Sequence, residues 1–166
     1  MDQHEITEAG TLLDGRGRLR EAGWSRRPLL SYERGAVAAP LRRIKEWDYY
    51  SVLAQDFGVS FMVADLGYVG VVSAGVFDSS QARYAHETYM VPLPLGSFSM
   101  PASSENGDVR VRHKKGTVNF SVMGGGARVV KVDFPHFDHG MGLRGAIVLS
   151  EQRGADSIVT ATPWPK

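Results

Sequence analysis

Residues 61–77 read FMVADLGYVGVVSAGVF, and this stretch decides the fold class. It is the most apolar part of the chain, but Asp65, Leu66 and Gly67 interrupt it, and β-branched residues and glycines fill much of the rest. A membrane-spanning helix needs about 20 consecutive apolar residues, most of them good helix formers. Two strands joined by a turn at residues 65–67 therefore explain the stretch better than a membrane helix does.

The same pattern continues on both sides of this stretch. The chain has 19 glycines, and short runs rich in Val, Phe, Tyr and Thr lie between them. This pattern is typical of strands and turns, and no window of helical length shows sustained apolar spacing of the helical kind. We expect about nine strands from residue 43 onward, at the spacing of a sandwich or barrel. Their expected positions are residues 43–53, 59–64, 68–77, 83–91, 108–113, 117–123, 127–134, 143–151 and 158–162.

An antiparallel meander of this kind can form a barrel or a sandwich. Closing the sheet removes its exposed edges, and eight or nine strands can close around a ligand. We therefore predict an all-β fold and favour a lipocalin-like β-barrel over a β-sandwich. In this interpretation residues 43–166 form the barrel or sandwich, and residues 1–42 form an N-terminal strap with a small hairpin around residues 14–17.

The composition excludes several classes of protein. The 166 residues, 43% of them apolar, suit one folded domain. Cysteine is absent, which rules out disulfides and thiolate metal sites. The formal charge of +1 gives no reason to expect nucleic acid or an anionic membrane as a partner. Because the first residues lack the basic and apolar parts of a signal peptide, we expect a cytoplasmic protein.

Charge is nevertheless distributed in blocks. Residues 15–45 carry nine bases and two acids, whereas residues 46–108 carry one base and eight acids. Five arginines surround Trp24 in the basic block, namely Arg16, Arg18, Arg20, Arg26 and Arg27. Such a segment could bind phosphates and stack bases. We favour a structural strap, containing Trp24, whose arginines pair with the acidic block.

Residues 45–50, KEWDYY, hold the densest group of side chains capable of chemistry. Alternate residues of a strand share a face, so Glu46, Asp48 and Tyr50 lie on one face and Trp47 on the other. We predict that the even face points inward and binds a ligand. Burial between apolar neighbours would then raise the pKa of the carboxyl groups, as in an acid–base site. The alternative is a solvated face whose acids pair with arginines.

Trp47, on the opposite face of this strand, is expected to pack beneath the arginine-rich strap. We therefore assign a structural role to Trp47, as to Trp24. A large buried aromatic of this kind contributes about 3–5 kcal/mol to stability.

Two loops resemble functional motifs only superficially. His136, Asp138 and His139 could hold a metal, but they lie on a glycine-flanked loop without the fixed spacing of a zinc site. Gly124-Gly125-Gly126 lacks the lysine–serine pair and the helix that follow a phosphate-binding loop. We therefore predict no metal site and no cofactor, and we interpret residues 124–126 as a hairpin turn.

Several segments together resemble the N-terminal half of the bacterial domain-of-unknown-function 2804 family (DUF2804). These segments are residues 5–8 (EITE), 12–17 (LLDGRG), 23–29 (GWSRRPL), 45–50 (KEWDYY) and 132–135 (VDFP). The resemblance implies no assigned activity, and it implies that this chain is the first half of a longer two-domain protein. More loosely, the architecture is similar to that of two-domain lipocalin-like proteins around the carotenoid hydratases. A likeness of fold does not transfer function.

Three functions stay open. The first and favoured one is a domain that binds a hydrophobic or amphipathic small molecule. The second is an interaction domain that packs on a missing C-terminal β-domain or self-associates. The third is an isomerase- or hydratase-type enzyme that uses the cavity of carboxylates and aromatics. A cavity lined by Trp47 and Tyr50 favours the first and third, whereas a flat apolar patch on one sheet favours the second.

Overall fold

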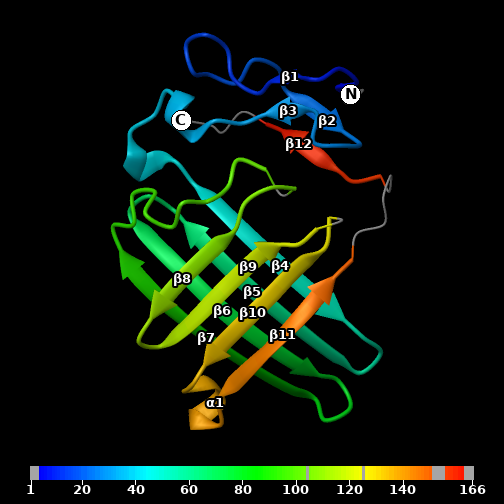
Figure 1. Ribbon diagram of the computed structural model, residues 1–166, viewed down its shortest axis with the longest axis vertical. Coiled ribbons are helices and arrows are strands. Elements are labelled where there is room, and N and C mark those ends of the chain that lie inside the picture. Colours follow the sequence, from blue (N-terminus) through cyan, green and yellow to red (C-terminus); the bar gives the residue numbers. More distant parts are fainter. Residues whose placement is uncertain (1–3, 104, 125, 151–155, 163–166) are drawn as a thin grey trace.

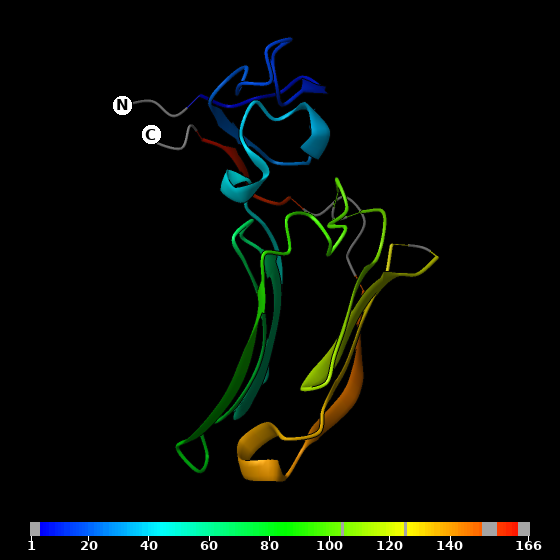
Figure 2. The ribbon, with the colours of Figure 1, turned by 90° about the vertical axis from the view of Figure 1, so that its left-hand side faces the viewer.

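Two four-stranded antiparallel sheets face each other in the computed structural model (Figures 1 and 2). The structure describes residues 4–103, 105–124, 126–150 and 156–162. The first sheet is a meander of β4 (Glu46–Leu53), β5 (Phe57–Asp65), β6 (Val69–Asp78) and β7 (Arg83–Pro92). The second is a meander of β8 (Val109–His113), β9 (Gly116–Val122), β10 (Arg128–Phe134) and β11 (Leu143–Leu149). A four-residue turn of helix, α1 (Phe137–Gly140), connects β10 to β11.

The N-terminal segment lies across one end of the two sheets (Figure 1). It contains β1 (Gly10–Thr11), β2 (Gly23–Ser25), β3 (Leu30–Ser31) and the short 3-10 helices η1 (Arg34–Ala36) and η2 (Leu41–Arg43). β1 pairs with β3, and β2 pairs with β12 (Val159–Ala161). The last described strand is therefore part of the N-terminal unit, although about 130 residues separate it from β2 in sequence.

The core lies between the two sheets. Inward-facing residues alternate with outward-facing ones along the strands, as expected for packed sheets. Phe120 and Phe134 of the second sheet and Val63 and Val72 of the first are fully buried. Burial of each such side chain contributes about 1.5–3 kcal/mol relative to exposure, so this shared core holds the two sheets together.

The all-β prediction is confirmed, with 51% of the described residues in strands and 7% in helices. Each of the nine expected strands is present, within a few residues of its expected ends. The expected small hairpin around residues 14–17 is seen as a bridge between Leu13 and Leu19. No described helix is long and apolar enough to cross a membrane.

Closure into a barrel is not seen, because none of the described sheets closes on itself. The predicted single meander divides after β7, and β8 starts the second sheet. β7 ends at Pro92, and Pro94 follows in the connecting segment; neither offers a backbone N–H for pairing. Leu93 and Leu95 have φ values of 48° and 50°, which turn the chain away from the edge of β7. The predicted nine-stranded meander is therefore replaced by two facing sheets, with β12 paired elsewhere.

Candidate functional site

The even face of β4 points inward, as predicted. Glu46, Asp48 and Tyr50 are partly buried, whereas Trp47 and Tyr49 are exposed. The prediction that Trp47 packs beneath the arginine-rich segment is wrong. Trp47 is 59% exposed and does not lie under that segment. That segment covers the end of the two sheets rather than the outer side of the first sheet, as Figure 2 shows.

Glu46 connects the N-terminal segment to the first sheet. Its carboxylate accepts a hydrogen bond of 2.7 Å from the Tyr32 hydroxyl and forms an ion pair with Arg34. A second nitrogen of the same guanidinium lies 3.9 Å from the carboxylate of Asp65, which is fully buried. Because its oxygens are already occupied, Glu46 is suited to anchoring this segment more than to binding a ligand directly.

Asp65 organises the neighbouring turns. Its two carboxylate oxygens accept hydrogen bonds from the backbone N–H of Gly67, at 2.9 Å, and of Gly96, at 2.6 Å. The turn between β5 and β6 and the loop after β7 are thus held by one side chain. The Asp65-Leu66-Gly67 interruption seen in the sequence serves this structural purpose.

Asp48, Tyr50 and Arg128 meet between the two sheets. Arg128 comes from β10 of the opposite sheet, is only 4% exposed, and donates a hydrogen bond of 3.1 Å to the carbonyl of Gly107. Its guanidinium lies 5.9 Å from the centre of the Tyr50 ring, which makes an edge contact with Phe120 at 4.8 Å. The positive charge of Arg128 also attracts the carboxylate of Asp48. This cluster is the polar part of an otherwise apolar interior.

Arg128 was not predicted as a site residue from the sequence. A signal for it was present, because Arg128 shares the strand face of Val130, Val132 and Phe134. A single arginine in an apolar, inward-facing series is an unusual buried charge that needs a partner. The strand pattern could not show that Asp48 is the partner of Arg128, because Asp48 lies on a strand of the other sheet.

The carboxyl group of Asp48 is perturbed by its burial between the sheets. Burial raises the pKa of its carboxyl group, while attraction by Arg128 and a hydrogen bond from Tyr50 lower it by less. Its Oδ2 atom is buried and has no hydrogen-bond partner among the described residues. An unpaired buried acceptor costs about 1–3 kcal/mol, so a hydrogen-bond donor placed beside it would be favoured.

A pocket of about 390 Å³ adjoins this carboxylate. It lies where β4 meets the loop before β8. Nine residues line it: Tyr32, Lys45, Glu46, Trp47, Asp48, Met100, Pro101, Ala102 and Ser103. The structure therefore brings two of the three predicted ligand-binding residues, Glu46 and Asp48, into one pocket, while Tyr50 lies behind Asp48 among core residues.

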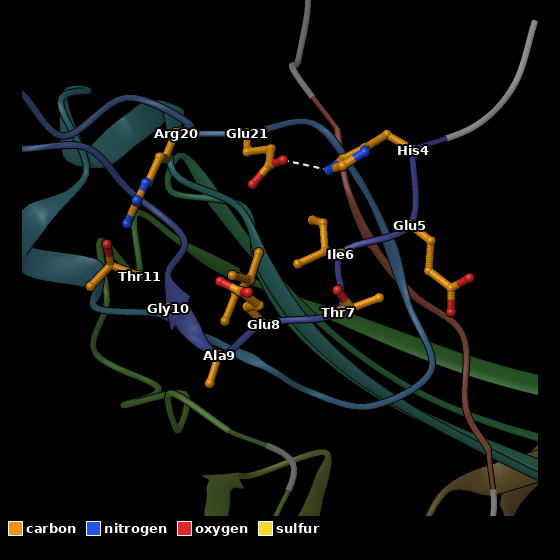
Figure 3. Close-up of a pocket in the computed structure, with 11 residues that line it drawn as sticks. His4, Glu5, Ile6, Thr7, Glu8, Ala9, Gly10, Thr11, Arg20 and Glu21 are labelled. Atoms are coloured by element: carbon orange, nitrogen blue, oxygen red, sulfur yellow. Dashed lines mark ion pairs between the residues drawn. The ribbon is translucent and has the colours of Figure 1, made fainter.

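A second pocket, of about 230 Å³, lies within the N-terminal segment (Figure 3). Charged side chains surround it, including His4, Glu8, Arg20 and Glu21, all of which are exposed. His4 and Glu21 form an ion pair across one side of it, as Figure 3 shows. None of its described lining side chains has a buried polar atom that lacks a hydrogen-bond partner, so the Asp48 pocket is the better candidate site.

The arginine-rich segment pairs mainly with its own neighbourhood. Arg18 pairs with Asp14, and Arg26 pairs with Glu5 and Asp156 while lying 5.3 Å above the ring of Trp24. Arg18 and Arg26 therefore do not pair with the acidic block 46–108 as predicted, whereas Arg34 of the same basic block pairs with Glu46 and Asp65. Asp14 and Glu5 belong to the N-terminal segment itself, and β12 brings the chain near Asp156 back to it.

The loop at residues 136–139, considered above as a possible metal site, makes an ion pair instead. Asp138 forms an ion pair with Arg83 at the end of the first sheet. Within the described ranges, no group of three or more His, Cys, Asp or Glu side chains is placed to hold a metal. Gly125, in the middle of the predicted turn at residues 124–126, lies outside the described residues.

Comparisons with known proteins yield one family. No curated protein and no solved structure matches the chain. The family described as Domain of unknown function (DUF2804) matches residues 3–166, which is nearly the whole chain. The resemblance found in separate segments of the sequence thus extends from end to end, and the chain belongs to the DUF2804 family.

Proposed function

We propose that this chain is a binding domain for an amphipathic small molecule, whose polar group is held by Asp48. The observation that carries the proposal is the buried Oδ2 atom of Asp48, which lacks a hydrogen-bond partner among the described residues. Asp48 itself lines a pocket of about 390 Å³. Pockets of about 300–1,000 Å³ with a few well-placed polar groups are typical small-molecule sites. In this proposal the ligand lies between β4 and the loop before β8, outside the packed core that the two sheets share.

The chemistry of the pocket restricts the ligand. Trp47, Met100 and Pro101 supply apolar surface, and Tyr32 adds an aromatic ring. An ionised carboxylate only accepts hydrogen bonds, so the ligand needs a hydroxyl or an amine opposite Asp48. Arg128 already places a positive charge near this carboxylate, which favours a neutral hydroxyl over a cation.

Native mass spectrometry of the protein purified gently from cells tests the proposal. The wild-type chain should carry extra mass that denaturation releases, and Asp48→Asn should lose it. Asp133→Asn is the matched control, because Asp133 is an aspartate of β10 whose carboxylate pairs with Arg144, away from the pocket. The proposal fails if Asp48→Asn retains the same mass as the wild type, or if the wild type carries none.

A further inference from the structure

The outer face of the sheet β4–β5–β6–β7 carries no Asp, Glu, Lys or Arg. The strand register places four residues of β4, four of β5, five of β6 and five of β7 on this face. These residues are Trp47, Tyr49, Ser51, Leu53, Gly58, Ser60, Met62, Ala64, Val69, Val71, Ser73, Gly75, Phe77, Tyr84, His86, Thr88, Met90 and Pro92. Figure 2 shows the two sheets edge-on, with no other segment lying over this face.

Six large apolar side chains on this face are exposed, by 46% to 76% of their residue surface. They are Trp47, Tyr49, Leu53, Phe77, Tyr84 and Met90. An aromatic side chain of this kind has about 150–250 Å² to bury, so the four aromatic residues alone present roughly 400 Å². Leu53 and Met90 enlarge this apolar area, whereas Gly58, Ala64, Ser73 and Gly75 are buried and add little. The large side chains alone thus supply a substantial part of the area of about 800 Å² that each partner contributes to a stable protein interface.

The other sheet shows that this composition is specific to one side of the molecule. The outer face of the second sheet carries charged residues on its strands, among them Arg110, Arg112, Lys131, Asp133 and Arg144. It follows the ordinary alternation of an antiparallel sheet, apolar inside and polar outside. The outer face of the first sheet is apolar instead of charged, as is typical of a surface that a partner covers.

We propose that this face binds the same face of a second copy of the chain, in a symmetric dimer. A two-fold axis brings a surface against itself, which a charged surface resists through like-charge repulsion. Two copies of a face without acids or bases can pack together without like-charge repulsion. This inference does not rest on the proposed ligand, although Trp47 belongs both to this face and to the lining of the Asp48 pocket.

The shape of the face also suits self-association. Large side chains stand on the edge strands β4 and β7, whereas the central strands β5 and β6 carry mostly small ones, including Gly58, Ser60 and Gly75. Gly75 is closely covered, since a Cβ atom there would lie 2.7 Å from the Ser60 hydroxyl. Several of these small residues are already buried beside the large ones, with Ala64 3% and Ser73 7% exposed. The large side chains of β4 and β7 therefore form most of the surface that a second copy would contact, with the two sheets about 10 Å apart.

Sedimentation equilibrium of the full chain over a range of concentrations tests the dimer. We expect a dimer in the wild type, and a dissociation constant raised by about 100-fold or more in Tyr49→Lys and in Met90→Lys, because each change places two like charges at the symmetric interface. Val148→Lys is the matched control. Val148 is an apolar residue of β11 that is 61% exposed, so this variant should dimerise like the wild type.

Trp47 gives a second readout that needs no charged substitution. Its fluorescence should shift to shorter wavelength as the wild-type chain is concentrated, and Trp47→Phe should lack this shift. Circular dichroism identifies any lysine variant that fails to fold, in which case the Trp47 emission decides. A wild-type chain that stays monomeric, lysine variants that dimerise normally, or a monomer that binds only a different protein would each overturn the proposal.

Discussion

At the scale of single residues, Asp48 combines a charge with partial burial. Its pKa is raised in the folded chain, with burial as the largest cause. A group whose pKa is raised on folding stabilises the fold below its unfolded pKa, about 3.9 for aspartate, and this contribution is lost as the pH rises through the folded pKa. At neutral pH the ionised Asp48 therefore lowers the free energy of unfolding.

Asp48→Asn should consequently raise the melting temperature at pH 7. The difference from the wild type should shrink as the pH falls and disappear below about pH 4, where both side chains are uncharged. Thermal melts followed by circular dichroism between pH 3.5 and 7.5 measure this. If the variant melts at a lower temperature than the wild type at pH 7, attraction between Asp48 and Arg128 outweighs the cost of burial.

Trp47 and Phe120 should differ in their contributions to stability, although both are large aromatics. Trp47 is 59% exposed, whereas Phe120 is fully buried and contacts Tyr50. Phe120→Ala should cost about 3–5 kcal/mol, as for a buried aromatic, while Trp47→Ala should cost less than about 1 kcal/mol in the monomer. Urea unfolding at low protein concentration gives both values. Equal losses would show that Trp47 is covered in solution.

At the scale of elements, the turn between β5 and β6 is docked on η2. Gly67 has a φ of 81°, and a Cβ atom added there would lie 2.6 Å from the backbone of Arg42. Gly140, with a φ of 92°, has open space around its Cβ position. At residue 67 any side chain would both clash with the backbone of Arg42 and be forced into a left-handed conformation. At residue 140 only the left-handed conformation opposes a side chain.

Gly67→Ala should therefore be more destabilising than Gly140→Ala. The left-handed conformation alone costs roughly 1–2 kcal/mol for alanine, which is the loss expected at residue 140. At residue 67 the clash with backbone adds to this, and we expect roughly 3 kcal/mol or more in total. Chemical denaturation of the two variants compares them directly. Similar losses at both residues would mean that η2 moves away from the turn without cost.

At the scale of the whole molecule, the two sheets share one core. Its buried residues come from both sheets, including Phe61 and Tyr89 on one side and Phe120 and Phe134 on the other. The Tyr89 hydroxyl also donates a hydrogen bond of 3.0 Å to the carbonyl of Gly116 in the second sheet. Neither sheet can lose its partner without exposing its own inner face to water.

Unfolding should therefore be a single cooperative transition. Far-ultraviolet circular dichroism, which follows the strands, and near-ultraviolet circular dichroism, which follows the packed aromatics, should give coincident melting curves. Because strands dominate, the folded spectrum should lack strong helical minima. A near-ultraviolet transition that precedes the far-ultraviolet one would show that the sheets separate before they unfold.

The sequence by itself determined the strands, the turns and the inward direction of Glu46, Asp48 and Tyr50. These features depend on neighbours along the chain, because a strand alternates its faces every residue and a turn is set by glycine, proline and short polar residues. The short-range pattern around Asp65 and Gly67 was sufficient to separate β5 from β6.

Only the tertiary structure decided which strands meet across space. It separated one expected meander into two sheets, paired β12 with β2, placed Arg128 opposite Asp48 and left Trp47 on an uncovered face. These outcomes depend on contacts between residues far apart in the sequence, and on which side of a sheet another layer covers. The alternation of a strand defines two faces, but it does not state what lies against each of them.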